Sequence, residues 1–71
     1  MLNMSTKRME VRLIGTEDAI QRDLPAVVTV LLGGQLFECQ FRHYSIARSV
    51  VTRIVRENHL RLSHGVWKSK D

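Results

Sequence analysis

The chain has a single cysteine and a single proline, and aromatic residues make up only 6% of it. One cysteine cannot form an intramolecular disulfide, which argues against a small secreted domain held together by disulfides and favours a reducing, cytoplasmic location. The longest apolar stretch, residues 26–32, is far shorter than the roughly 20 residues of a membrane span, and no signal-peptide pattern opens the chain. We therefore expect a soluble protein with no membrane partner.

Sequence motifs for catalysis or cofactor binding are also missing. The chain contains no G-x-G-x-x-G, no G-x-x-x-x-G-K-[ST] and no H-E-x-x-H. Cys39 is expected on the buried face of a strand, where a thiol is inert. The Cys39/His43 and His59/His64 spacings superficially resemble a zinc site, but Cys39 and His43 would lie about 13 Å apart along a strand. The sequence thus predicts a non-enzymatic protein without catalytic residues, metal or cofactor.

The length of 71 residues leaves room for one domain with a small core. No repeat, low-complexity tract or linker divides the chain. Domains of this size usually gain stability from a disulfide, a metal ion or a partner subunit, so a homodimer is one arrangement that the sequence leaves open. Residues 1–6 are expected to form a loose N-terminal tail, and residues 65–71 a basic C-terminal tail.

Positive charge is concentrated in the second half of the sequence. The formal net charge is +4 at pH 7, yet basic and acidic residues balance over residues 1–35, so the whole excess lies in residues 36–71. Such an asymmetry indicates an anionic partner, although it says nothing about the fold. Duplex nucleic acid and an acidic protein surface are the two partners that fit.

The first two secondary-structure elements are expected before Pro25. In residues 8–14 apolar and charged side chains alternate, a period typical of a strand with one buried face. Thr16, followed by two acidic residues, suits the start of a helix. A short helix over residues 17–24 would then end at Pro25, because proline removes a backbone donor and disfavours a helical residue before it.

Residues 26–42 predict a β-hairpin. Two runs rich in β-formers flank Gly33 and Gly34, which supply the positive φ angles of a two-residue turn. This turn places Val28 opposite Cys39 and gathers the apolar side chains of both strands on one face. The members of this face are Val28, Val30, Leu32, Phe37, Cys39 and Phe41. We expect the face to be buried, with Phe37 and Phe41 packed against Val51 and Ile54.

Residues 46–58 predict an amphipathic basic helix with Ser45 at its N-cap. On a helical wheel its apolar stripe consists of Ile46, Ala47, Val50, Val51, Ile54 and Val55. The opposite side carries Arg48, Ser49, Thr52, Arg53 and Arg56. Residues 59–62 are expected to add a last short strand. The predicted fold is therefore α+β, with a small antiparallel sheet (strand 8–14 plus hairpin 26–42) packed by one helix, 46–58.

Residues 49–58 resemble the recognition helix of helix-turn-helix DNA-binding proteins. Their polar side carries donors suited to phosphate oxygens and guanine edges. The resemblance extends upstream to residues 41–46, which can be laid over the end of a first helix and its turn. It implies binding to duplex DNA. The candidate residues for binding nucleic acid or a protein partner are Arg42, Arg48, Ser49, Thr52, Arg53, Arg56, Arg61, Trp67, Lys68 and Lys70.

Two functions fit these observations. The first is a small regulatory protein that binds duplex DNA through its Arg-rich helix, since so few aromatic residues argue against base stacking on single strands. The alternative is a small protein of the kind that phages and mobile elements encode, which binds and inhibits or modulates a host protein complex. In that case the basic face would dock on an acidic surface, with Trp67 as an apolar anchor.

Overall fold

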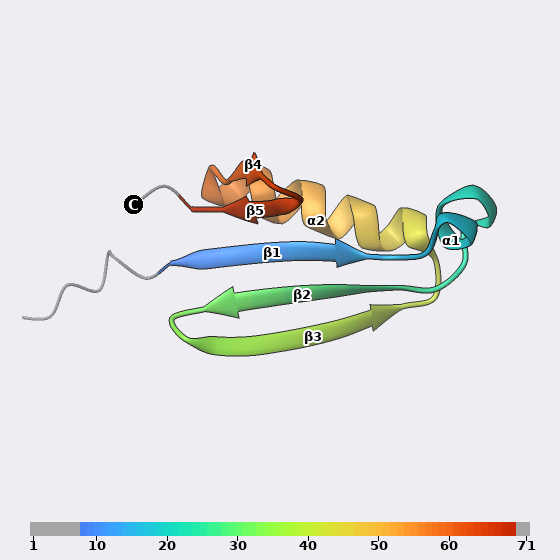
Figure 1. The fold of residues 1–71 in the computed structure, drawn as a ribbon, viewed down its shortest axis with the longest axis horizontal. Helices are drawn as coiled ribbons and strands as arrows, with labels where there is room; N and C mark the ends of the chain where they lie inside the picture. The colour runs from blue at the N-terminus through green and yellow to red at the C-terminus, as the bar shows by residue number, and fades with distance from the viewer. Residues whose placement is uncertain (1–7, 70–71) are drawn as a thin grey trace, which may run out of the picture.

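A computed structural model describes residues 8–69 and contains one antiparallel sheet with two helices (Figure 1). The strands are β1 (Met9–Ile14), β2 (Ala26–Leu32), β3 (Gln35–Phe41), β4 (Arg61–Ser63) and β5 (Val66–Lys68). The helices are α1 (Glu17–Arg22) and α2 (Tyr44–Asn58). The strand order is β3-β2-β1-β5-β4, so β1 lies in the centre. The predicted α+β fold class is confirmed.

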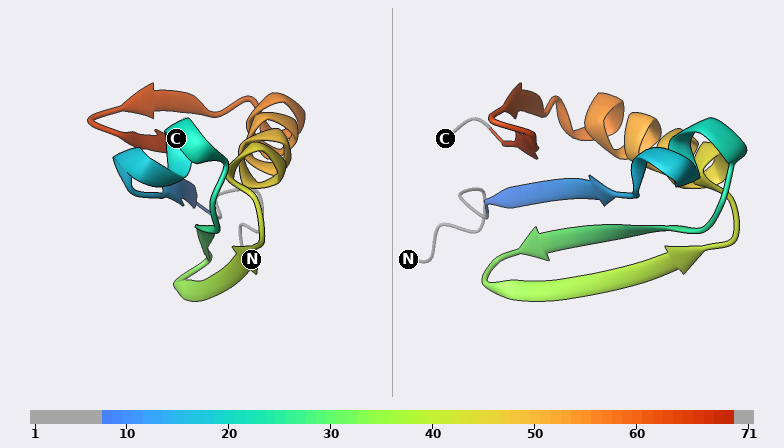
Figure 2. Two further views of the ribbon diagram at one scale, coloured as in Figure 1. Left: turned by 90° about the vertical axis from the view of Figure 1, so that its right-hand side faces the viewer. Right: turned by 45° about the vertical axis from the view of Figure 1, so that its right-hand side comes forward.

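The long helix α2 packs on one face of this sheet, and α1 lies beside its first turns (Figures 1 and 2). The left view of Figure 2 shows that the sheet curves around α2, with β4 and β5 on one side and β2 and β3 on the other. The side of α2 that faces away from the sheet is left uncovered by the described residues.

The predicted hairpin is confirmed in its turn and its register. Gly33 and Gly34 have φ angles of 57° and 86°, as a type I′ turn requires. Val28 pairs with Cys39, and Val30 pairs with Phe37. Residues with a side chain rarely adopt these angles, so the two glycines fix where the chain reverses and hence which residues are neighbours.

The expected burial of the β3 half of this hairpin is wrong. Phe37 is 50% exposed and Cys39 is exposed, although Phe41 packs partly against the core. The reason is the position of β3 in the sheet. β3 is the edge strand, two strands away from the central β1, and the buried cluster under α2 includes residues of β1 and β2 but none of β3.

The core is built from small side chains. Its buried cluster consists of Val11, Ala26, Val28, Ala47, Val51 and Leu60. Valine and alanine let α2 approach the sheet closely, but they bury little apolar area per residue. The larger side chains Tyr44 and Trp67 pack around this cluster and are only partly buried.

α2 begins two residues earlier than predicted, and Ser45 is not its N-cap. The N-cap is His43, whose side chain makes no capping hydrogen bond. Ser45 lies in the first turn, where its N–H donates to Asp23 Oδ1 at 2.7 Å and its Oγ donates to Asp23 Oδ2 at 3.1 Å. The free N–H of the first turn is thus satisfied by a carboxylate that follows α1, a long-range contact that a local sequence pattern does not reveal.

The prediction of a basic C-terminal tail over residues 65–71 is wrong for residues 66–68. Residues 66–68 form β5, in which Trp67 pairs with Val11 of β1 and with Leu62 of β4. His64 and Gly65, both with positive φ, form the turn between β4 and β5. Lys70 and the predicted N-terminal tail, 1–6, lie outside the described residues.

The upstream part of the helix-turn-helix resemblance is also not supported by the fold. Phe41, which was laid over the end of a first helix, is the last residue of β3, and the segment before it is strand rather than helix. The resemblance is therefore confined to α2 itself.

Candidate functional site

The exposed side of α2 is the first candidate surface. It carries Arg48, Ser49, Thr52, Arg53 and Arg56, all exposed. These residues recur at spacings of three and four, which places them on neighbouring turns of one side of the helix. The buried residues of the helix, Ala47 and Val51, lie on the side opposite Ser49 and Arg53, and Arg48 stands at the border between the two sides. We call these five residues the α2 arginine face.

The arginines of this face have no carboxylate partner within residues 8–69. The ion pairs there join Arg22 to Asp18 at 3.3 Å and His43 to Asp23 at 3.7 Å, and neither involves the α2 arginine face. Its three guanidinium groups therefore keep their charge and their hydrogen-bond donors available to an external anion. Arginine suits such a partner because its planar donors match phosphate and carboxylate oxygens.

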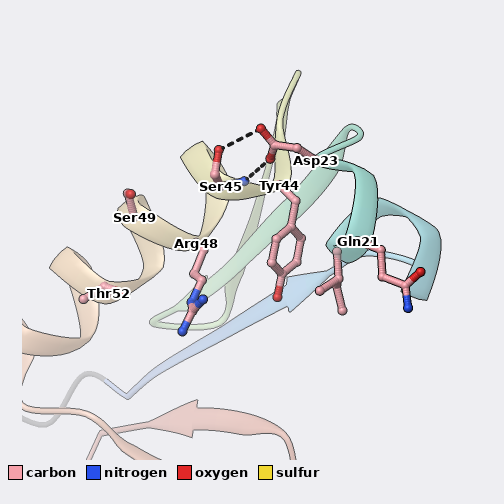
Figure 3. A pocket seen from close by; sticks show the side chains of 8 residues that line it. Gln21, Asp23, Tyr44, Ser45, Arg48, Ser49 and Thr52 are labelled. Atoms are coloured by element: carbon pink, nitrogen blue, oxygen red, sulfur yellow. Dashed lines mark hydrogen bonds between the residues drawn. The ribbon is translucent and has the colours of Figure 1, made fainter.

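One flank of the α2 arginine face borders a groove between α1 and α2, shown in Figure 3. We call it the α1–α2 groove. Its volume is about 700 Å³. The lining residues are Ile20, Gln21, Asp23, Tyr44, Ser45, Arg48, Ser49 and Thr52. In Figure 3 the side chains of Tyr44 and Arg48 extend in the same direction from α2, while Ser45 turns toward Asp23.

Asp23 holds the two walls of this groove together. Its pKa is lowered, chiefly because the Ser45 backbone N–H donates to the carboxylate, with smaller contributions from the Ser45 hydroxyl and the charge of His43, while desolvation acts in the opposite direction. The carboxylate also sits at the N-terminus of α2, where the helix dipole favours negative charge. His43 Nδ1 lies 3.0 Å from the backbone oxygen of Asp23 and adds a second link.

We expect Asp23→Asn to be less stable than the parent protein at neutral pH and to lose that difference in acid. The folded protein favours the ionised Asp23, so its stabilisation is present above the ordinary pKa of 3.8 and is lost as the pH falls through the lowered value. Asparagine keeps an oxygen acceptor and tolerates the left-handed φ of 56° at this position. Urea unfolding from about pH 7 to about pH 3 measures the effect.

Asp23→Ala is the matched control for this prediction. Alanine loses the acceptor and disfavours the left-handed conformation, so this variant should be less stable than Asp23→Asn across the pH range. A parent and an Asp23→Asn variant with parallel pH profiles would contradict the role given to the carboxylate charge.

A second groove lies between α2, β1 and β5, and we call it the α2–β5 groove. Its volume is about 530 Å³. The lining residues are Leu13, Tyr44, Arg48, Val51, Thr52, Val55, Arg56 and Trp67. Tyr44, Arg48 and Thr52 line both grooves, so the two hollows adjoin along one flank of α2. Trp67 therefore lines a groove from a strand and does not project from a tail.

Three further predicted site residues, Arg42, Arg61 and Lys68, line neither of these two grooves. Arg42 is exposed between β3 and α2 and lines a separate hollow of about 360 Å³ beside Pro25. Arg61 is exposed on β4, opposite Lys68 of β5. Lys68 is half-buried, and Glu10 of β1 lies opposite it on its other side, a favourable pairing of charges. The structure thus brings together the α2 residues and Trp67, but not these three.

Sequence reasoning missed Tyr44 and Asp23 as site residues. A signal for Tyr44 was present, because it lies four residues before Arg48 and so continues the helical period by one turn. It was overlooked because the helix was expected to begin at Ile46. Asp23 had no comparable signal, since its role depends on α1 and α2 meeting in space.

Residues 8–69 contain no group of three or more His, Cys, Asp or Glu side chains placed to hold a metal ion. No helix in this part of the chain has the length and apolar character needed to cross a membrane. That folding requires no metal or cofactor stays a prediction. Comparison with known protein families, curated proteins and solved structures gives no match to this chain.

Proposed function

We propose that this protein is a small non-enzymatic regulator that binds duplex DNA through the α2 arginine face. The supporting observation is that three exposed arginines and two hydroxyl groups share one side of a helix, with no carboxylate partner for the arginines within residues 8–69. Arginine can contact phosphates and the O6 and N7 edge of guanine, and serine and threonine donate to phosphates. The same face thus offers groups for both backbone and base contacts.

The shape of α2 fits this role. The helix has 15 residues, and a helix can enter the major groove of B-DNA, which is about 12 Å wide. The buried residues of α2, Ala47 and Val51, belong to the side that packs on the sheet, and Arg53 and Arg56 are exposed, so the sheet would not cover these arginines. Arg42 and Arg61 are exposed just before and just after α2 in the sequence, and in this proposal they add separate phosphate contacts on the flanking backbone.

A salt series with charge-matched variants tests the proposal. Arg53→Gln/Arg56→Gln removes two positive charges from the α2 arginine face, and Arg12→Gln/Arg22→Gln removes two from exposed positions on β1 and α1. Each lost phosphate contact should lower the slope of log K against log salt by roughly 0.9, so we expect a decrease of about 1.8 for the first variant only. Glutamine has a helix propensity close to that of arginine, and circular dichroism checks the fold.

Two results would contradict DNA binding through α2. One is a parent affinity weaker than about 10⁻⁴ M at physiological salt, which is below ordinary non-specific binding. The other is an equal change of slope in both variants, which would mean that the net charge matters and its position does not.

A second candidate function, binding to an acidic protein surface, is favoured by the α2–β5 groove. Its apolar lining residues Leu13, Val55 and Trp67 lie beside Arg48 and Arg56, an arrangement suited to an apolar side chain flanked by carboxylates. Trp67→Phe separates the two functions. It should weaken a nuclease-resistant protein complex while leaving the salt slope of duplex binding unchanged.

A further inference from the structure

The edge strand β3 leaves one side of its backbone unpaired within the described residues. Within residues 8–69 its only strand neighbour is β2, and residues 35–40 are all exposed. Edge strands are usually protected by proline, lysine, a bulge or very short length. β3 has seven residues and contains neither proline nor lysine, and its register with β2 is unbroken. Glu38 is its one charged residue.

The direction of the free backbone groups follows from the hairpin turn. In a type I′ turn over Gly33 and Gly34, the N–H of Gln35 bonds back to β2, and hydrogen-bonded pairs then alternate along the strands. The N–H and C=O groups of Leu36, Glu38 and Gln40 therefore point away from β2. The Gly33 N–H donates to Arg8 O at 3.2 Å and so points toward β1. Because neighbouring residues of a strand point in opposite directions, Leu32 then points toward β3, as its pairing with Gln35 requires.

Apolar side chains lie uncovered on the α2 side of this edge. Phe37 is 50% exposed, and the neighbouring Cys39 is exposed as well. Ile46, at 48% exposure, lies about 200° around α2 from Arg48 and so belongs to the helix flank opposite the α2–β5 groove. The margin of the domain on the β3 side thus combines free backbone groups with unburied apolar area.

We propose that two copies of this chain pair through β3 in an antiparallel arrangement whose two-fold axis passes at Cys39. Residues whose backbone groups point away from β2 alternate along β3, and each must pair with a residue of the same kind in the second copy. An axis between two consecutive residues would pair residues of different kinds, so the axis has to pass through a residue. An axis at Glu38 would place two glutamates opposite each other, which is unfavourable. An axis at Cys39 places Glu38 opposite the second copy's Gln40 and Phe37 opposite its Phe41, with the small cysteine at the crowded centre.

The small core supports a second copy as the occupant of this edge. Domains of this size commonly gain part of their stability from a partner subunit, and the buried cluster here consists of valine, alanine and one leucine. Pairing at β3 would join the two sheets into one and place both α2 helices on the same face. Phe37 and Cys39 would then line the trough between the two helices, where they lose exposed area. This arrangement does not depend on the proposed binding to DNA.

Cys39 provides a direct test in the unmodified chain. On the proposed axis the two Cys39 residues form a non-hydrogen-bonded pair with Cα atoms about 4.5 Å apart, within the range that a disulfide spans. We expect a dimer by light scattering under reducing conditions and its rapid cross-linking by a mild oxidant. Cys39→Ser/Phe37→Cys moves the single thiol by two residues. Its two thiols would then be separated by about 14 Å along the strand and should not cross-link.

Glu38→Pro tests the backbone contacts themselves. It removes an outward N–H without removing a bond to β2, a position where edge strands tolerate proline, so we expect a folded monomer. Amide exchange of the parent gives the same information without a mutation, because Glu38 and Gln40 should be protected at high protein concentration and exchange quickly on dilution. A parent protein that stays monomeric over the whole concentration range, or cross-linking that is equal at positions 37 and 39, would overturn the proposal.

Discussion

Val11→Asp should leave the chain unfolded at room temperature, whereas Arg12→Asp, at the next position of β1, should fold. Val11 is fully buried in the central strand, paired with Val30 on one side and Trp67 on the other. A carboxylate there would have no partner and no water, and burying such a group costs several kcal/mol. That cost is comparable with the entire stability of a small domain, about 5 kcal/mol or more.

Arg12→Asp is the control because it changes more charge at a neighbouring site. Arg12 is exposed on the other face of β1, opposite Thr29, so an aspartate at this position keeps its hydration. Thermal melting followed by circular dichroism, with amide chemical-shift dispersion as a second readout, distinguishes the two variants. A cooperative melt of Val11→Asp near that of the parent would show that β1 does not form the centre of the sheet.

Ala47→Leu should cost about 1–3 kcal/mol through overpacking, the second large effect that we expect. Ala47 is fully buried where α2 lies on the sheet, and it belongs to the same cluster as Val28 and Val51. Leucine adds a branched side chain at a contact that valine and alanine keep close. The helix would have to move away from the sheet or force its neighbours out of their preferred rotamers.

The melting temperature measures this effect, since 1 kcal/mol corresponds to about 4–8 °C for a domain of this size. Ile46→Leu is the matched control, because it introduces the same residue one position earlier, where the side chain is about half exposed. We expect that variant to stay within about 0.5 kcal/mol of the parent. Equal losses in both variants would mean that a leucine is costly at an exposed position of this helix as well, and that packing at Ala47 does not determine the result.

The parts of the fold that could be predicted from the sequence are those that local chemistry determines. Gly33 and Gly34 permit a turn that few other residues allow, and this turn sets the partners of every residue in the hairpin. The end of α2 at Asn58 was also predictable, because the apolar period of the helix stops there. In both cases the information lies within a few residues of the feature.

The burial of Cys39 was predicted wrongly because it depends on the order of the strands. A three-stranded sheet of β1, β2 and β3 would place the hairpin under the helix. With β5 next to β1, the central strand is β1, and β3 lies two strands away at the edge, outside the buried cluster and with Cys39 exposed. β5 has only three residues, too few to show a period, and its pairing joins opposite ends of the chain.

The candidate site likewise has one part that could be predicted from the sequence and one part that could not. The residues of the α2 arginine face follow from the helical wheel, because a single helix determines which of them are neighbours. The two grooves require α1, β1 and β5 to be placed against α2. The contact of Asp23 with Ser45, which joins the two walls of the α1–α2 groove, spans 22 residues of sequence. No periodic pattern carries that information.

The first and last described strands also determine how the domain would respond to mechanical load. Ser69 N–H donates to Met9 O at 2.9 Å, and Met9 N–H donates to Ser69 Oγ at 2.9 Å. β1 and β5 are antiparallel, so the chain enters and leaves the sheet at the same end of this pair. Tension on the two ends would therefore break these hydrogen bonds one after another, as a zipper opens, and would not shear the whole ladder at once. A pull on its ends should open this domain at lower force than a sheet whose terminal strands must slide past each other.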